Sequence, residues 1–97
     1  MGGYFTLLNS KTVELTIESS GWSGDIAPYK YVISNNGITS SNTLDLIINA
    51  NTKELLDMVG KAKISGYLQE SGKVTIYAWG TKPSINMPAH LIVRGGI

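Results

Sequence analysis

The chemistry that this chain could perform is limited first by its single histidine and its lack of cysteine. His90 falls between Ala89 and Leu91 in a segment that alternates like a β-strand, and the alternation places it on the polar face. A histidine in that setting is far more often a surface residue than a general base. The sequence has no nucleophile-elbow pattern, no Walker A loop and no Gly-x-Gly-x-x-Gly motif. We therefore expect a protein that is not an enzyme.

Acidic residues give no stronger indication of a metal site. Glu14 and Glu18 fall on the same polar face of one predicted strand, where solvation is their expected role. Metal ligation would require His90 together with carboxylates scattered along the chain. The sequence predicts no metal and no cofactor.

The aromatic residues carry the main candidate binding site. An aromatic ring offers a rigid apolar face on which a sugar ring can stack, while its polar tip stays hydrated. The competing interpretation is that these rings, Trp22 and Trp79 above all, are buried in the core, which is the more frequent role of large aromatics. Two pairs share a strand face, so we expect them to line either a subunit interface or a ligand groove. The candidate residues for saccharide stacking are Trp22, Tyr29, Tyr31, Tyr77 and Trp79.

The elements that must position these residues are mostly strands. Strict alternation of apolar and polar residues over 12–18 predicts a strand with one hydrated face. β-branched and aromatic residues, bounded by Gly, Asn and Pro, extend this prediction to the other segments. The remaining predicted strands span residues 29–34, 43–49, 64–69, 74–79 and 89–94.

Turn and helix signals separate these strands. Asn35-Asn36-Gly37 predicts a tight hairpin, and residues 70–73 predict a hairpin loop. Apolar residues at helical spacing predict a helix over residues 52–63, with Asn51 as its cap and Glu54 completing a capping box. We therefore expect a mainly β protein, an antiparallel β-sandwich or sheet of about six strands with one short α-helix between strands 3 and 4.

Composition limits the classes of partner. A chain of 97 residues is one domain, residues 1–97. Only 15% of it is charged, compared with about 25% in a typical globular domain, and its net charge of +1 does not favour nucleic-acid binding. No stretch is long and apolar enough to span a membrane.

Within residues 1–11, an N-terminal segment is too apolar for a free tail, and we expect it to contact a neighbouring chain through Tyr4, Phe5, Leu7 and Leu8.

A family resemblance covers nearly the whole chain, roughly residues 12 to 94. The motifs that carry it are Val13-Glu14-Leu15-Thr16-Ile17, Gly21-Trp22-Ser23-Gly24, Ala27-Pro28-Tyr29, Asn36-Gly37-Ile38-Thr39, Gly72-Lys73-Val74-Thr75-Ile76-Tyr77-Ala78 and Lys82-Pro83. This pattern of strands, Gly-Trp loop and turns resembles small β-rich modules of tailed-phage virion proteins, namely those of the head fibre, tail fibre and baseplate. The resemblance implies a mostly β module, commonly trimeric, that serves attachment or decoration of the particle. Some such modules bind host-surface saccharides, and no functional residue can be transferred individually.

Three hypotheses follow. The leading one is a non-enzymatic structural module of a phage virion, assembled in the host cytoplasm, homotrimeric and in contact with other virion proteins, with adhesion to the host surface as its candidate task. The second is a monomeric carbohydrate-binding module that uses Trp22, Tyr29 and Trp79 for stacking. The third, and least favoured, is a small enzyme or enzyme-inhibitor domain that uses His90.

Overall fold

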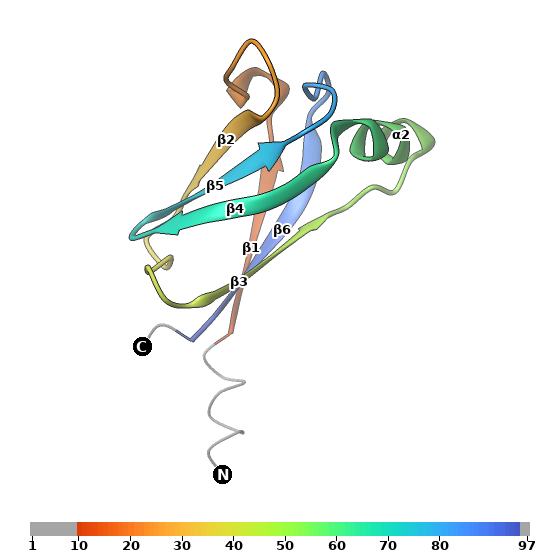
Figure 1. Ribbon diagram of the computed structural model, residues 1–97. Coiled ribbons are helices and arrows are strands. Elements are labelled where there is room, and N and C mark those ends of the chain that lie inside the picture. Colours follow the sequence, from red (N-terminus) through yellow and green to blue (C-terminus); the bar gives the residue numbers. More distant parts are fainter. Residues whose placement is uncertain (1–9, 96–97) are drawn as a thin grey trace.

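The computed structural model describes residues 10–95, which form a sandwich of two three-stranded antiparallel sheets with one α-helix (Figure 1). This confirms the predicted fold class, including the helix between the third and fourth strands. The elements are β1 (Lys11–Ile17), a short 3-10 helix η1 (Ser19–Gly21), β2 (Tyr29–Ser34), β3 (Thr43–Ile48), α2 (Lys53–Ala62), β4 (Ile64–Glu70), β5 (Lys73–Ala78) and β6 (Met87–Arg94).

The first sheet has the strand order β1-β6-β3, with β6 antiparallel to both neighbours. Its strands alternate as the sequence predicts, with apolar side chains towards the core and mainly polar ones on the outer face, where Ile47 and Ile92 are the apolar exceptions. Ile17, Ala89, Leu91 and Val93 are buried. Strand β6 begins at Met87, two residues before the predicted start, because Pro88 lies opposite Thr16 and Met87 opposite Ile17.

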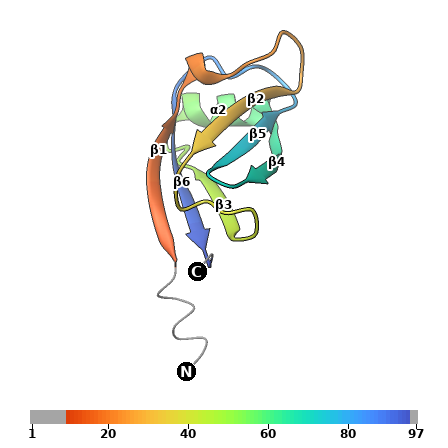
Figure 2. The ribbon, with the colours of Figure 1, turned by 90° about the vertical axis from the view of Figure 1, so that its left-hand side faces the viewer.

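The second sheet has the strand order β2-β5-β4 and faces the first across the core (Figure 2). The predicted hairpin between β4 and β5 is confirmed, with Glu70 opposite Lys73 and a positive φ of 84° at Gly72. Strand β4 also carries an irregularity, because its register to β5 shifts between Ile64 and Tyr67. Gly66, within that irregularity, has a φ of 81°, which glycine adopts without strain.

The Asn35-Asn36-Gly37 prediction was right about a turn and wrong about a hairpin. The Ile38 amide donates to the Asn35 carbonyl, and the Asn35 side chain accepts from the Gly37 amide. However, β2 and β3 belong to different sheets, so this turn leads the chain from one sheet to the other. Its backbone also bonds to Gly72 at the tip of the β4–β5 hairpin, a tertiary contact that no local signal specifies.

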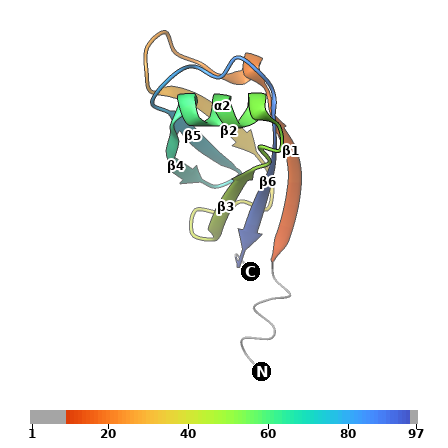
Figure 3. The same cartoon turned by 90° about the vertical axis from the view of Figure 1, so that its right-hand side faces the viewer.

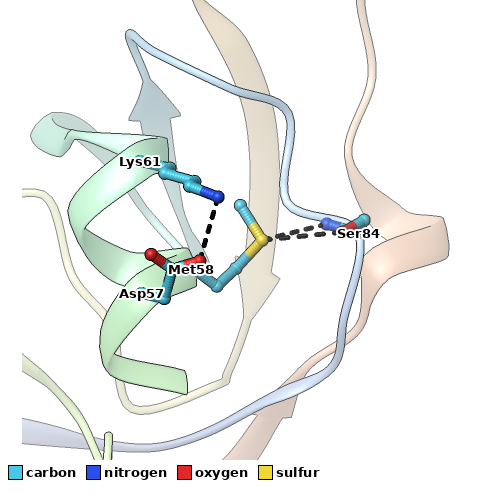
Figure 4. Close-up of polar contacts among 4 residues, drawn as sticks. All are labelled: Asp57, Met58, Lys61 and Ser84. Carbon is cyan, nitrogen blue, oxygen red and sulfur yellow. Dashed lines mark hydrogen bonds and ion pairs between the residues drawn. The ribbon is translucent and has the colours of Figure 1, made fainter. Parts of the chain in front are cut away.

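Helix α2 closes one end of the sandwich (Figure 3). Its N-cap is Thr52, whose hydroxyl accepts from the Leu55 amide at 3.2 Å, so the predicted cap at Asn51 was wrong by one residue. Met58 is buried, and its sulfur lies 3.5 Å from the amide nitrogen of Ser84 in the loop before β6 (Figure 4). An exposed ion pair joins Asp57 to Lys61 on the same helix.

Polar side chains tie the two sheets together at their margins. The Tyr31 hydroxyl accepts from the Glu18 amide and donates to the Thr16 carbonyl, which joins β2 to the end of β1. On the other side, the Gln69 amide nitrogen lies 2.7 Å from the carbonyl oxygens of Thr39 and Asn42, in the loop before β3. These bonds hold the margins of the sandwich, while its interior is apolar.

Candidate functional site

The five aromatic residues predicted to stack on a saccharide are divided between the core and the solvent face of the second sheet. Tyr29 and Tyr31 are opposite Ala78 and Ile76, so they face the core and pack against it. Trp22 is also in the core, with only 4% of its surface exposed. The chain therefore does not bring Trp22, Tyr29 and Trp79 together into one stacking surface.

The inner aromatic group is held by its own contacts. The rings of Trp22 and Tyr31 lie 5.3 Å apart at an interplanar angle of 51°, which is a favourable aromatic geometry. The Trp22 indole nitrogen is buried without a hydrogen-bond partner among the described residues. Tyr29 is half-buried, and the Lys82 ammonium lies 5.8 Å from its ring centre. These contacts match the alternative interpretation, in which the inner rings are core residues.

The outer aromatic pair belongs to a larger exposed surface. Tyr77 is an outward residue of β5, and Trp79 follows that strand with its ring centre 6.4 Å from that of Tyr77. Val32 and Leu68 flank Thr75 on either side of the same strand. We call Val32, Leu68, Tyr77 and Trp79 the outer apolar surface.

Exposure on this surface is high for apolar side chains. Val32, Leu68 and Trp79 are 52%, 53% and 55% exposed, whereas Thr75 between Val32 and Leu68 is 9% exposed. The Trp79 indole N–H donates to the Ser65 carbonyl at 2.8 Å, which directs the ring across β4 and leaves no free indole donor. On the same outward face, exposed Lys30 lies opposite Tyr77, so the surface combines apolar area with one neighbouring ammonium group.

His90 lies on the outer face of the other sheet and forms a small polar cluster. Its Nε2 lies 3.3 Å from a Glu14 carboxylate oxygen, and its Nδ1 lies 2.7 Å from the Asn49 amide nitrogen. The Asn49 amide and the Glu14 carboxylate therefore lie at opposite nitrogens of the ring. Both ring nitrogens are thus engaged, and no serine or threonine among residues 10–95 bonds to the ring. A cavity of about 360 Å³ adjoins this cluster.

A second cavity, of about 420 Å³, lies between the two sheets on the side where β3 and β4 form their edges. We call it the inter-sheet groove. Both sheets and α2 contribute to its wall, which is mostly aliphatic. The lining residues are Ile33, Leu44, Asp45, Leu46, Ile48, Val59, Ile64, Ser65, Gly66, Tyr67, Val74, Ile76 and Leu91.

Several residues of these surfaces were not among the predicted site residues. Val32 lies within a continuous run of β-formers, so the sequence did not say which of its neighbours faced outwards. Tyr67 and Leu68 follow the irregularity in β4, which changes the face that each residue occupies. The predicted interface residues Tyr4, Phe5, Leu7 and Leu8 lie outside the described residues.

Residues 10–95 contain no group of three or more His, Asp or Glu side chains able to hold a metal ion. In the same part of the chain, no helix has the length and hydropathy needed to cross a membrane.

Comparison of the chain with protein-family models, curated proteins and solved structures finds no match.

Proposed function

We propose that this chain is a non-enzymatic structural module that assembles with copies of itself, as a homotrimeric subunit of a phage virion. The self-association rests on one observation, the outer apolar surface. The virion setting and the number of copies rest on the resemblance of its strand and loop motifs to phage head-fibre, tail-fibre and baseplate modules. Adhesion to a host surface is the task that this setting suggests.

The outer apolar surface supports self-association because it breaks the usual pattern of a one-sided sheet. An antiparallel sheet with one face on a core normally presents polar residues on the other face. Here three large apolar side chains are more than half exposed on the solvent face of a single sheet. Exposed apolar surface that includes aromatic residues is typical of protein interfaces. The low charge of the chain adds little repulsion between copies.

A charge placed on this surface tests the proposal. We expect Leu68→Asp to reduce the molar mass in solution from that of three chains to that of one, because a buried unpaired carboxylate is strongly unfavourable at an interface. Ile26→Asp is the matched control, since Ile26 is 79% exposed and lies outside the outer apolar surface. An unchanged oligomer in Leu68→Asp, with native circular dichroism, would exclude this surface from the interface.

A monomeric carbohydrate-binding module is the second candidate, favoured by one specific feature. Trp79 and Tyr77 place two rings side by side on the solvent face, inclined at 40°. Under this proposal the wild-type chain binds a glycan as a monomer, and Trp79→Ala abolishes binding. Leu56→Ala, on α2 at a position that is 62% exposed, leaves binding unchanged. A glycan array with both variants and the wild-type chain decides between the two candidates when read with the molar mass.

A further inference from the structure

The inter-sheet groove marks a place where the core of this sandwich is incomplete. Tyr67 lies opposite Ile76 on β5, so its side chain is on the inner face, yet it is 56% exposed. Leu46, Ile48 and Ile64 also line the groove and are only partly buried. On the opposite edge of the first sheet, Ile17 is fully buried, while Val13 and Leu15 are partly buried and line no such groove. Among the described residues, the side between β3 and β4 therefore lacks apolar cover.

The two edge strands beside the groove differ in how they are protected against pairing. Strand β4 is interrupted by the register shift and by Gly66, and such irregularities prevent regular pairing. Strand β3 has the sequence Thr-Leu-Asp-Leu-Ile-Ile, which contains no proline, glycine or lysine. Within residues 10–95 it pairs only with β6. Its single charged residue, Asp45, forms an ion pair with Arg94 at 3.0 Å. The free edge of β3 is therefore open to an added strand.

One segment of this chain has the chemistry that this edge and groove require. Residues 4–8 are Tyr-Phe-Thr-Leu-Leu, with four large apolar residues and no charge. In an extended strand, Phe5 and Leu7 fall on one face, which suits the aliphatic groove. The opposite face of the added strand then lies beside Ile47, an outward residue of β3 that is 50% exposed.

Chain length limits which residues of the molecule's own segment can reach this position. Lys11, Val93 and Leu44 lie in one row across β1, β6 and β3. A strand added beside β3 is three strand spacings from β1, about 14 Å. Leu8 stands only three positions before Lys11, and three residues span at most about 11 Å when fully extended. Leu8 of the same chain therefore cannot lie beside β3, so a strand formed by all of residues 4–8 must come from another copy.

We infer that residues 4–8 of a second copy of this chain add a strand to the free edge of β3 and insert Phe5 and Leu7 into the inter-sheet groove. Each copy donates one segment and accepts another through a different surface, so the contact is heterologous, and it gives a ring when the rotation between copies closes. Closure of that ring with three copies rests on the proposed homotrimer. The strand addition itself requires only a second copy.

Disulfide trapping tests this arrangement directly, because the chain has no native cysteine. Full-length Leu7→Cys is mixed with full-length Leu46→Cys under mild oxidation, so that any bond between positions 7 and 46 joins two copies. The matched control replaces Leu46→Cys with Val13→Cys, a partly buried inward residue on β1 that does not line the groove. We expect peptide mapping by mass spectrometry to find the 7–46 bond as the main mixed product and only traces of a 7–13 bond.

The outcomes separate this inference from the proposed function. A wild-type trimer by light scattering that gives no 7–46 bond between copies would overturn the strand addition and leave the homotrimer intact. A wild-type monomer at all concentrations, with no 7–46 bond, would overturn both. A Leu7→Cys/Leu46→Cys double variant that forms the bond within one chain and stays monomeric would show that the segment serves its own molecule, which also contradicts the inference. As a second readout, Phe5→Ser/Leu7→Ser should lose the trimer while keeping native circular dichroism.

Discussion

The close approach of Gly80 to the end of α2 gives a prediction whose size follows from the structure. Gly80 donates its amide to the Ala62 carbonyl at 2.9 Å, and the next residue, Thr81, donates to the Lys61 carbonyl at 2.9 Å. These bonds satisfy carbonyls that an α-helix leaves without partners at its C-terminus. A Cβ atom at position 80 would collide with the Lys61 carbonyl oxygen. Gly80→Ala must therefore push the segment away from the helix.

The expected cost can be worked from those two bonds. Each is worth about 0.5–1.5 kcal/mol net, so weakening both costs about 1–3 kcal/mol. The gain from restricting the unfolded chain offsets about 0.4–1 kcal/mol of this. We expect Gly80→Ala to lower the free energy of unfolding by about 1–2 kcal/mol, out of the roughly 5–15 kcal/mol typical of a domain.

Urea unfolding at one fixed chain concentration measures this effect, because self-association makes apparent stability depend on concentration. With a slope of about 1–2 kcal/mol per molar urea, the midpoint should fall by about 1 M. Gly60→Ala is the matched control, since Gly60 lies in the same helix and an added Cβ there would meet no neighbouring element of the described chain within 4 Å. It should raise stability by about 0.5–1 kcal/mol. A Gly80→Ala midpoint equal to or above that of the wild type would refute the reasoning.

Two further predictions concern the polar ties between the sheets. Gln69→Leu should cost about 1–3 kcal/mol in urea unfolding, because it removes the donor shared by the Thr39 and Asn42 carbonyls; a loss below about 0.5 kcal/mol would show that solvent satisfies those carbonyls equally well. Tyr31→Phe should cost about 1 kcal/mol while keeping the ring packing, because only the hydroxyl bonds to Glu18 and Thr16 are lost. An unchanged midpoint for Tyr31→Phe would mean that those bonds do not hold β2 to β1.

The sequence was sufficient to predict the elements because their signals are local. Alternation of Val13, Leu15 and Ile17 predicts both the strand and the face that it buries, and the structure confirms both. Helical spacing of Leu55, Val59 and Ala62 likewise predicts α2. Such patterns depend on residues only a few positions apart, so no tertiary information is needed to recognise them.

The pairing of the strands, by contrast, depends on long-range contacts. Asn36-Gly37 has the composition of a hairpin turn, but its surroundings bond to Gly72 at the tip of another hairpin, and β3 lies in the other sheet. The split of the aromatic residues between the core and the outer face has the same cause, because it also depends on long-range contacts. Trp22 and Trp79 have similar sequence surroundings, Gly-Trp-Ser and Ala-Trp-Gly, yet one is buried and the other exposed. The difference lies in their tertiary positions, because Trp22 packs in the core and Trp79 lies on the solvent face of the second sheet.

The molar mass of the wild-type chain in solution is the most direct test of the central claim, that this module functions by associating with itself. It should be measured by light scattering on a sizing column over a wide range of chain concentrations. We expect a stable mass of three chains of 10.4 kDa that persists on dilution. A mass of one chain at every concentration would contradict self-association, and the exposed rings of Tyr77 and Trp79 would then be the surface to test against glycans.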